Sequence, residues 1–349
     1  MKINSIHQGL IGVSSIMKKI LLMIKFLLVV TYSLIIVPHV FFPSSGLNIT
    51  LSSKLFFAQF YSFPILFGGS LVIGSLVIFG ICLLINQIIL KKRKIGLFWL
   101  AIGLLSLVFM IGGSEPTKTT SLEETKTIKI VEWNTLDNLN KAHIEKIFKD
   151  YDADIAVFPE LDNQSLEASF REVGLDFDRY EVFLSPKTGG GIAPVTVITK
   201  KDFSGYRMVR EDNMTSFGTV VLQAKDKAKP AIVGLHTAPP LPALMNAWER
   251  DLVLIAHHLS KQYRDAIIIG DFNATMRHGA MNELGTYEDA LSYLPKFGRG
   301  TWHTRLPSYF RTTIDHVLVP KDSYVVQAIQ MVDFKVSDHA CVFVSLAKK

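Results

Sequence analysis

Carboxylate, amide and imidazole side chains recur in this sequence where apolar runs begin or end. The positions are Asn134 after KIVEW, Glu160 after DIAVFP, His236 after AIVGL, Asp271 and Asn273 after AIIIG, Asp315 before HVLVP, and Asp338 with His339 before ACVFVSL. Carboxylate and amide oxygens suit hard divalent cations, and a bound cation can neutralise a phosphoryl oxygen. The set therefore predicts a site that binds a divalent metal ion and a phosphate group together.

Two of these residues lie close together in the stretch IIIGDFNATM (267–276). On a strand, residues i and i+2 face the same way, so Asp271 and Asn273 are expected to aim at one point. Gly270 permits a close approach of the backbone there. The alternative is an Asx turn, in which the Asp271 side chain closes the strand by bonding the backbone two residues on.

The elements that carry these residues are short and mixed in type. From residue 128 onward, runs rich in β-branched residues predict many strands, and the segments 141–151 and 241–263 show helical spacing. Many strands with few helices favour two packed sheets flanked by helices. The expected fold class of this region is therefore α/β.

Three long apolar runs precede this region, at about 20–42, 64–90 and 95–113. A bilayer core requires about 20 apolar residues in a helix, so each run predicts a transmembrane helix. Buried core helices are the alternative for all three, and a cleaved signal peptide is an alternative for the first. Three such runs with almost no charge favour a membrane anchor over residues 1–113.

Basic residues predict the orientation of this anchor. The run KKRK (91–94) lies between the second and third apolar runs, and Lys18 and Lys19 precede the first. Because Lys and Arg concentrate in cytoplasmic loops, the N-terminus is expected in the cytoplasm and a three-span anchor places the rest outside it, at the plasma membrane. The polar segment 114–127 is expected to be a linker, and 128–349 the catalytic domain.

Charge is divided unevenly along the chain. Residues 1–127 carry 11 of the 37 basic and 3 of the 31 acidic residues, a balance of +8, which leaves −2 for residues 128–349. Tight nucleic-acid binding depends on many Lys and Arg contacts to phosphates, so it is not expected of the C-terminal region. The two cysteines, Cys82 and Cys341, predict neither a disulfide nor a zinc site.

Six short motifs, in order and in strand context, resemble those of the endonuclease/exonuclease/phosphatase superfamily. They are WNT (133–135), ADIAVFPE (153–160), GLHT (234–237), GDFNA (270–274), TIDHVLV (313–319) and SDH (337–339). The resemblance covers about residues 128–349 and implies a four-layer α/β/β/α sandwich that hydrolyses phosphoesters. The three apolar runs resemble the anchor of a bacterial subgroup with an external catalytic domain.

The resemblance implies a role for each matching residue. Glu160, with Asn134 beside it, looks like the ligand of Mg²⁺, with Mn²⁺ as the alternative, and Asp338 looks like an outer ligand. Asp271 resembles the residue that orients or deprotonates the attacking water. The implied phosphate-binding and positioning residues are Asn273, His236 and His339, the last paired with Asp315. His316, where Tyr is frequent, and Pro159, where Gln is common, depart from the family pattern without removing a catalytic group.

Residues near the last motifs are further candidates. Trp302 and Arg305 are expected to contact the substrate, although Trp302 filling the core and Arg305 lying on a solvated face are the alternatives. Arg299 and Arg311 flank the same segment, and each is expected either to contact a phosphate group or to lie on a solvated face. The glycine run 189–191 is expected to be a loop, because no GK[ST] and helix follow it.

Three functions remain open at this point. The first is a membrane-anchored, metal-dependent phosphoesterase acting outside the cytoplasm on a phosphorylated substrate, such as a lipid-linked phosphate or pyrophosphate in the bilayer. The second is an anchored extracellular nuclease that uses the same catalytic residues. The third is a binding module that keeps the fold without catalysis.

Overall fold

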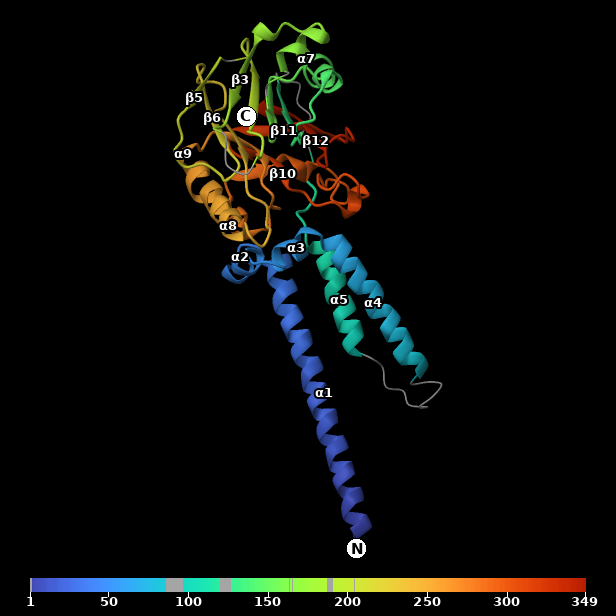
Figure 1. Ribbon diagram of the computed structural model, residues 1–349. Helices are drawn as coiled ribbons and strands as arrows, with labels where there is room; N and C mark the ends of the chain where they lie inside the picture. Colours follow the sequence, from blue (N-terminus) through green and yellow to red (C-terminus); the bar gives the residue numbers. More distant parts are fainter. Residues whose placement is uncertain are drawn as a thin grey trace. The chain divides into compact units, whose positions relative to one another are not determined.

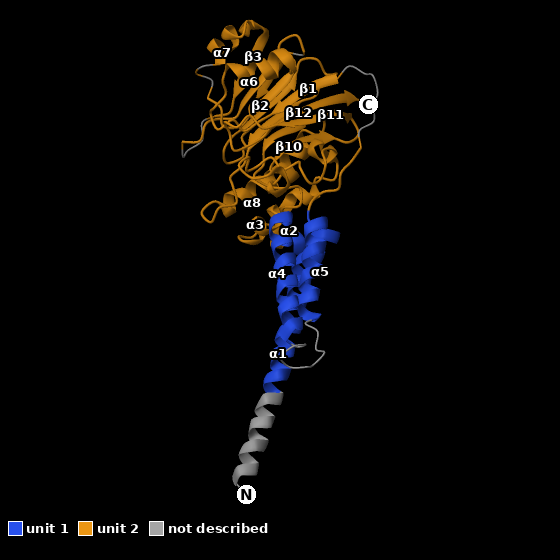
Figure 2. Cartoon of the chain, turned by 90° about the vertical axis from the view of Figure 1, so that its right-hand side faces the viewer, with its two compact units in different colours: residues 1–48, 64–113 blue, residues 49–63, 114–349 orange. Residues whose placement is uncertain are grey.

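The computed structural model describes residues 2–85, 97–119, 127–162, 164, 166–186, 191–203 and 205–349, with side chains from residue 16 onward (Figure 1). The basic run 91–94, residues 120–126 of the expected linker 114–127 and the first two glycines of the run 189–191 lie outside these residues. The chain forms two compact units, one of residues 1–48 and 64–113 and one of residues 49–63 and 114–349 (Figure 2).

Unit 1 is helical. It contains α1 (Lys2–Phe41), α4 (Pro64–Leu84) and α5 (Leu97–Gly112). By length and composition, Ile16–Phe41 and Pro64–Leu84 are able to cross a membrane. The expectation of three such helices is not met, because the third apolar run forms a helix of 16 residues, shorter than the usual span of about 20 residues.

Small residues line the contacts between the helices of unit 1. A Cβ atom added to Gly68 in α4 would lie 2.9 Å from the Cβ of Met110 in α5, and one added to Gly103 in α5 would lie 3.3 Å from the Cβ of Ser75 in α4. The Tyr32 hydroxyl in α1 lies 2.9 Å from the Ser106 hydroxyl in α5. Close backbone approach at small residues with hydroxyl hydrogen bonds is the packing used by helices in lipid.

Unit 2 is built on two six-stranded sheets. The first has the strand order β11-β12-β1-β2-β4-β3, and the second has the order β5-β6-β7-β8-β10-β9. The strands of the first sheet are β1 (Thr127–Glu132), β2 (Ile155–Phe158), β3 (Tyr180–Leu184), β4 (Thr196–Lys200), β11 (Tyr324–Val332) and β12 (Cys341–Lys348). Those of the second are β5 (Tyr206–Val209), β6 (Thr219–Ala224), β7 (Ile232–His236), β8 (Ile267–Asp271), β9 (Tyr287–Asp289) and β10 (Asp315–Pro320).

Three apolar clusters hold the layers of unit 2 together. The central one lies between the sheets and includes Ile130 of β1 and Ile269 of β8. A second covers the outer face of the β5–β10 sheet with α8 (Met245–Leu254), the helical turns Ile255–Leu259 and Gly279–Glu283, and α3 (Phe57–Ser62). The third covers the other sheet with α6 (Lys141–Ile144), the turn Glu145–Asp150 and α7 (Leu166–Glu172). The mixed α/β class and the paired sheets are confirmed.

The segment Ile49–Phe63, which we call the connector, belongs to unit 2 although it precedes α4 in the sequence. It contains the end of α2 (Gly46–Ser52) and all of α3. Ala58 of α3 is fully buried and joins the apolar cluster around Trp248 and Leu252. The compact units thus divide the chain differently from a simple anchor over 1–113 followed by a separate domain.

Strand directions bring the polar residues to one edge of the paired sheets. β1 and β2 are parallel, as are β7 and β8, so their carboxyl ends share an edge. β10 runs antiparallel to β8 with Asp315 opposite Asp271, and β12 runs antiparallel to β1. The start of β10 and the segment before β12 therefore reach the same edge.

Candidate active site

Gly270 fixes how β8 ends. Its φ angle is 147°, and a Cβ atom at this position would lie 1.9 Å from the Leu235 carbonyl oxygen of the neighbouring β7. No side chain fits in that gap, so glycine is required there. The close approach sets Asp271 opposite His236 in the strand register.

Asp271 lies at the centre of the polar cluster and is almost completely buried. The Asn134 amide Nδ2 donates to Asp271 Oδ2 at 3.0 Å, and His236 Nε2 lies 3.4 Å from the same oxygen. His339 Nε2 lies 3.7 Å from it. Although burial alone would raise the pKa of Asp271, His339 and His236 lower it to about 2, so the carboxylate is ionised at neutral pH.

Asn273 does not share a strand face with Asp271, because β8 ends at residue 271 and Asn273 has a positive φ of 47°. The Asn273 backbone N–H donates to Asp271 Oδ1 at 2.8 Å, which is the Asx turn that the sequence left open. The Asn273 amide Nδ2 donates to the Thr237 carbonyl at 3.1 Å. The expected alternation is therefore wrong, and the turn and β7 position Asn273 instead.

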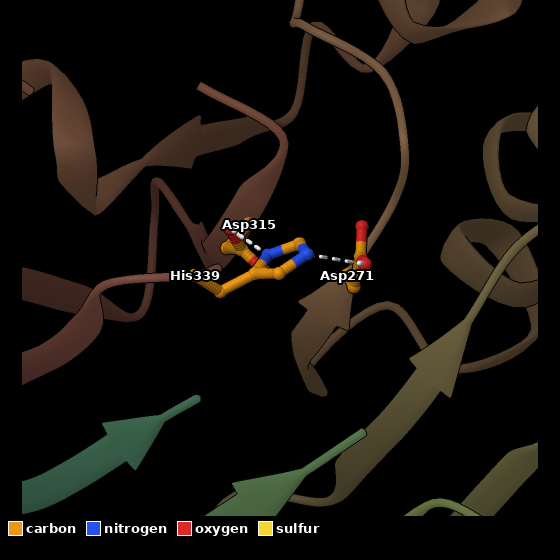
Figure 3. Close-up of side chains that lie close together, drawn as sticks. All are labelled: Asp271, Asp315 and His339. Carbon is orange, nitrogen blue, oxygen red and sulfur yellow. Dashed lines mark hydrogen bonds and ion pairs between the residues drawn. The ribbon is translucent and has the colours of Figure 1, made fainter. Parts of the chain in front are cut away.

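His339 lies between two carboxylates, as Figure 3 shows. Its Nδ1 lies 2.9 Å from both oxygens of Asp315, and its Nε2 faces Asp271. Burial favours the neutral imidazole, but Asp315 and Asp271 outweigh it and raise the pKa of His339 to about 10. The ring is therefore an imidazolium at neutral pH, held in orientation by Asp315.

Glu160 joins the cluster from the end of β2. Its Oε1 accepts from Asn134 Nδ2 at 3.0 Å and lies 3.8 Å from His236 Nε2. The residue has a positive φ of 55°, and its carbonyl accepts hydrogen bonds from the Thr135 hydroxyl at 2.7 Å and from the Asp137 backbone N–H at 2.8 Å. These bonds hold an unfavourable backbone conformation that turns the carboxylate toward Asn134.

Two groups of side chains in the described residues are suited to a metal ion. Asp271, Asp315 and His339 bring potential ligand atoms within 4.8 Å of one another, and all three are buried, but the protonated His339 ring would have to lose a proton before it could bind an ion. Glu160 and Asn134, the ligands expected from the sequence, lie beside Asp271. The ion pairs of these carboxylates in the described chain are with histidines. An excess of clustered oxygen donors fits a hard divalent cation.

Glu132 is a residue of this region that the sequence reading did not single out. It lies at the end of β1, is fully buried, and neither carboxyl oxygen has a hydrogen-bond partner among the described groups. Burial, with Asp315 and Asp271 nearby, raises the pKa of Glu132 well above its usual range. The alternation of Ile128, Ile130 and Glu132 in the sequence already indicates that this acid faces the core between the sheets.

Trp302 contacts the cluster through Asp338. The indole Nε1 donates to Asp338 Oδ2 at 2.9 Å, and Asp338 Oδ1 lies 4.0 Å from His339 Nε2. Trp302 is thus half-buried beside the cluster and does not simply fill the core. Arg305 is exposed, and its backbone N–H donates to His303 Nδ1 at 3.3 Å. The structure does not bring its guanidinium into contact with the described residues of the cluster.

Arg299 and Arg311 have structural roles. Arg299 is buried and donates to the Glu115 carbonyl, and Arg311 donates to the Leu306 and Thr304 carbonyls at 2.7 and 2.6 Å. Arg311 also pairs with Asp333 at 3.0 Å. Both guanidinium groups are therefore engaged in holding loops.

Two further residues missed by the sequence reading support the cluster. The Ser337 hydroxyl donates to the Asn134 carbonyl at 2.7 Å and accepts from the His339 backbone N–H at 3.1 Å, which ties two catalytic candidates together. Asp251 of α8 is fully buried and accepts from the backbone N–H groups of Ser216 and Ala238 at 2.9 and 3.0 Å. Ser337 belongs to the SDH motif (337–339), where no role was assigned to it, and Asp251 lies in none of the six motifs.

One of the solved structures compared with this chain reaches a TM-score of 0.50, which indicates the same type of fold. An AP endonuclease, LMAP from Leishmania major, aligns with a TM-score of 0.50 and 13% identity over 66% of this chain and 92% of that one. The human Nocturnin catalytic domain aligns with a TM-score of 0.47 and 15% identity over 64% and 94%. ANGEL2, described as a 2',3'-cyclic phosphatase, aligns with a TM-score of 0.42 and 12% identity over 66% and 99%.

No functionally curated protein matches the chain. The sequence profile described as Endonuclease/Exonuclease/phosphatase family matches residues 131–339, which contain every residue of the polar cluster described above. This match covers more than half of the chain. The protein therefore belongs to the endonuclease/exonuclease/phosphatase family of phosphoester hydrolases.

Proposed function

We propose that this protein is a membrane-anchored, divalent-metal-dependent hydrolase of a lipid-linked phosphate or pyrophosphate. The observation that carries the catalytic part is the buried cluster around Asp271, which combines three carboxylates, an amide and two imidazoles. The cluster supplies both charges that phosphoester hydrolysis requires, namely anions to hold a metal and a cation to face phosphate.

Members of this family depend on divalent metal ions, and the donor set here suits Mg²⁺, with Mn²⁺ as the alternative. We assign the metal to Glu160 and Asn134, with Asp271 adjacent and Asp338 as an outer ligand. When bound, the ion neutralises charge on the phosphoryl and leaving oxygens.

The described side chains divide the remaining tasks. A general base works best with a pKa near the operating pH, so a pKa of about 2 suits Asp271 for orienting a water molecule by hydrogen bonding better than for taking its proton. The His339 imidazolium supplies positive charge for phosphoryl oxygens, and Asp315 prevents its ring from turning. His236 Nε2 lies near the same Asp271 oxygen as His339 Nε2, and the Asn273 backbone N–H donates to the other oxygen.

Membrane anchoring is supported by the two long apolar helices and by the fact that unit 2 contains segments from both sides of α4 and α5 in the sequence. The connector and residues 114–349 form one compact unit, so both lie on the same side of any membrane. If α4 crosses the bilayer between them, the chain has to return, and α5 is the apolar helix available in the described chain. This supports a third crossing by a short helix, about 24 Å long at 1.5 Å per residue.

The direction of the anchor rests on the sequence. The basic run 91–94 lies between α4 and α5, and Lys18 and Lys19 lie near the start of the apolar part of α1. Placing both in the cytoplasm puts the connector and the catalytic residues outside it.

A lipid-linked substrate fits an enzyme held at the bilayer, because anchoring raises the local concentration of membrane substrates. The balance of −2 over residues 128–349 disfavours tight binding of nucleic acid. A surface nuclease is the competing function, since it needs the same catalytic residues.

Hydrolysis by the full-length protein in lipid vesicles tests the proposal. The substrates are a polyprenyl pyrophosphate, sphingomyelin, a bis-aryl phosphodiester and plasmid DNA, each with Mg²⁺, Mn²⁺ or EDTA, and Glu160→Gln is the inactive control. Metal-dependent turnover of the lipid pyrophosphate without DNA cleavage is the expected result. DNA cleavage as the main activity would identify a nuclease, and no turnover with any substrate would indicate a binding module.

A further inference from the structure

The connector is attached to the catalytic unit by specific polar contacts. The Gly279 backbone N–H donates to Ser52 Oγ at 2.8 Å, and His278 Nε2 lies 3.0 Å from the Ala58 carbonyl. The Gln59 amide donates to the Pro240 carbonyl. Gly279 has a φ of 44°, and a Cβ atom there would lie 2.7 Å from Ser53 Oγ, so the two segments pack tightly.

The connector reaches the neighbourhood of the active site at two places. At α3, the His278 ring packs against Trp248, whose indole Nε1 donates to the Asn273 carbonyl at 3.0 Å. At the end of the connector, the rings of Phe63 and Trp302 lie 6.2 Å apart, and Trp302 donates to Asp338. At each place only one or two side chains separate the connector from the polar cluster.

The chemistry of the connector is that of a membrane interface. Its second half, LFFAQFYSF (55–63), carries five aromatic residues, of which Phe56 is 78% exposed. Leu241, next to the Pro240 that Gln59 contacts, is 54% exposed. Aromatic residues concentrate at the headgroup level of bilayers, and Phe63 directly precedes the first residue of α4.

We propose that the connector seats the active site at the headgroup level and that Phe63 with Trp302 forms the surface against which the hydrocarbon chain of the substrate lies. Both residues are half-buried, the two rings lie 6.2 Å apart, and Trp302 donates a hydrogen bond to Asp338. The inference rests on the proposed lipid phosphoesterase function. It assigns selection of the lipid chain to a segment outside the residues that match the family, 131–339.

Chain-length selectivity of the full-length enzyme tests this assignment. Initial rates are compared for a long-chain polyprenyl pyrophosphate in phosphatidylcholine vesicles and for a short-chain, water-soluble analogue with the same headgroup. Removing an aromatic contact of this size weakens binding about tenfold. Phe63→Ala is therefore expected to lower the ratio of kcat/KM for the long-chain substrate to kcat/KM for the short-chain analogue about tenfold, mainly by raising KM for the long-chain substrate.

Matched variants distinguish chain binding from loss of structure. Phe63→Trp is expected to restore the ratio, and Phe297→Ala, which truncates a 53% exposed aromatic elsewhere in unit 2, is expected to leave it unchanged. An unchanged ratio in Phe63→Ala, or an equal loss of activity on both substrates, would overturn the assignment.

A measurement without catalysis separates this inference from the proposed function. A nitroxide label at Phe56→Cys, in a Cys82→Ser background where the remaining Cys341 is buried, reports depth in vesicles through its accessibility to oxygen and to a water-soluble nickel chelate. We expect headgroup depth. A fully water-exposed label would overturn the seating of the connector even if lipid phosphate is hydrolysed, whereas headgroup depth without turnover would reject only the function.

Discussion

At the scale of single residues, two buried histidine–carboxylate pairs have the same chemistry but different surroundings. His339 pairs with Asp315 at 2.9 Å and faces Asp271, whereas His316 pairs with Asp289 at 2.8 Å and its other nitrogen lies 2.8 Å from the Ala274 carbonyl. Both nitrogens of His316 are thus bound by the fold. Of these two histidines, His339 is the one with a nitrogen directed at the polar cluster.

This contrast predicts different results for the same substitution. His339→Gln is expected to lower kcat by about a hundredfold or more, because it removes a positive charge facing the phosphoryl group. His316→Gln is expected to lower the melting temperature with little change in kcat per folded molecule. Steady-state kinetics and thermal unfolding of both variants check this. Equal losses of kcat would show that His339 has no special role.

The same residue predicts how stability depends on pH in the metal-free protein. Folding raises the pKa of His339 from 6.5 to about 10, so its stabilising contribution is complete below pH 6.5 and is lost as the pH rises toward 10. The free energy of unfolding should fall by up to about 1.4 kcal/mol per pH unit over this window. Urea titrations with EDTA present should show the slope in the native protein and a flatter one in His339→Gln.

At the scale of elements, the junction of β7 and β8 positions the catalytic carboxylate. Gly270→Ala should destabilise the protein by about 3 kcal/mol, because its Cβ atom would overlap the Leu235 carbonyl in a backbone conformation that disfavours side chains. Gly285→Ala, where no atom lies within 4 Å of the new Cβ, is the matched control and should change stability by less than about 0.5 kcal/mol. A small effect at Gly270 would mean that β7 and β8 can separate.

The elements also show what the sequence could and could not predict. Alternating apolar runs and polar strand ends are local signals, so the α/β class, the two sheets and the residues around Asp271 were predictable. The conformation of Asn273 was not, since it depends on where β8 stops pairing, which is a tertiary property. The docking of Ala58 and the loop-holding role of Arg311 depend on contacts between distant segments, which no local pattern encodes.

At the scale of the whole molecule, chain topology is open to direct test. The connector and residues 114–349 belong to one compact unit and so lie on the same side of a membrane. The segment 64–113 between them must therefore cross the membrane twice or not at all. In intact cells, a membrane-impermeant thiol reagent should reach Phe56→Cys and Phe297→Cys from the same side, with slower labelling at position 56, and should label a cysteine in the run 91–94 only after permeabilisation. Labelling of the two exposed sites from opposite sides would contradict the compact unit.

The burial of Ala58 by the catalytic unit also bears on shedding, the release of ectodomains from cell surfaces by proteolysis. A cut within residues 114–127 would free a fragment that leaves the connector behind. Trp248, Leu252 and the His278 ring would then lose their cover, and the fragment would present an apolar patch that favours aggregation. If the proposed anchor holds the protein in a membrane, a single cleavage in this segment is therefore expected to yield an aggregation-prone fragment instead of a stable, diffusible enzyme.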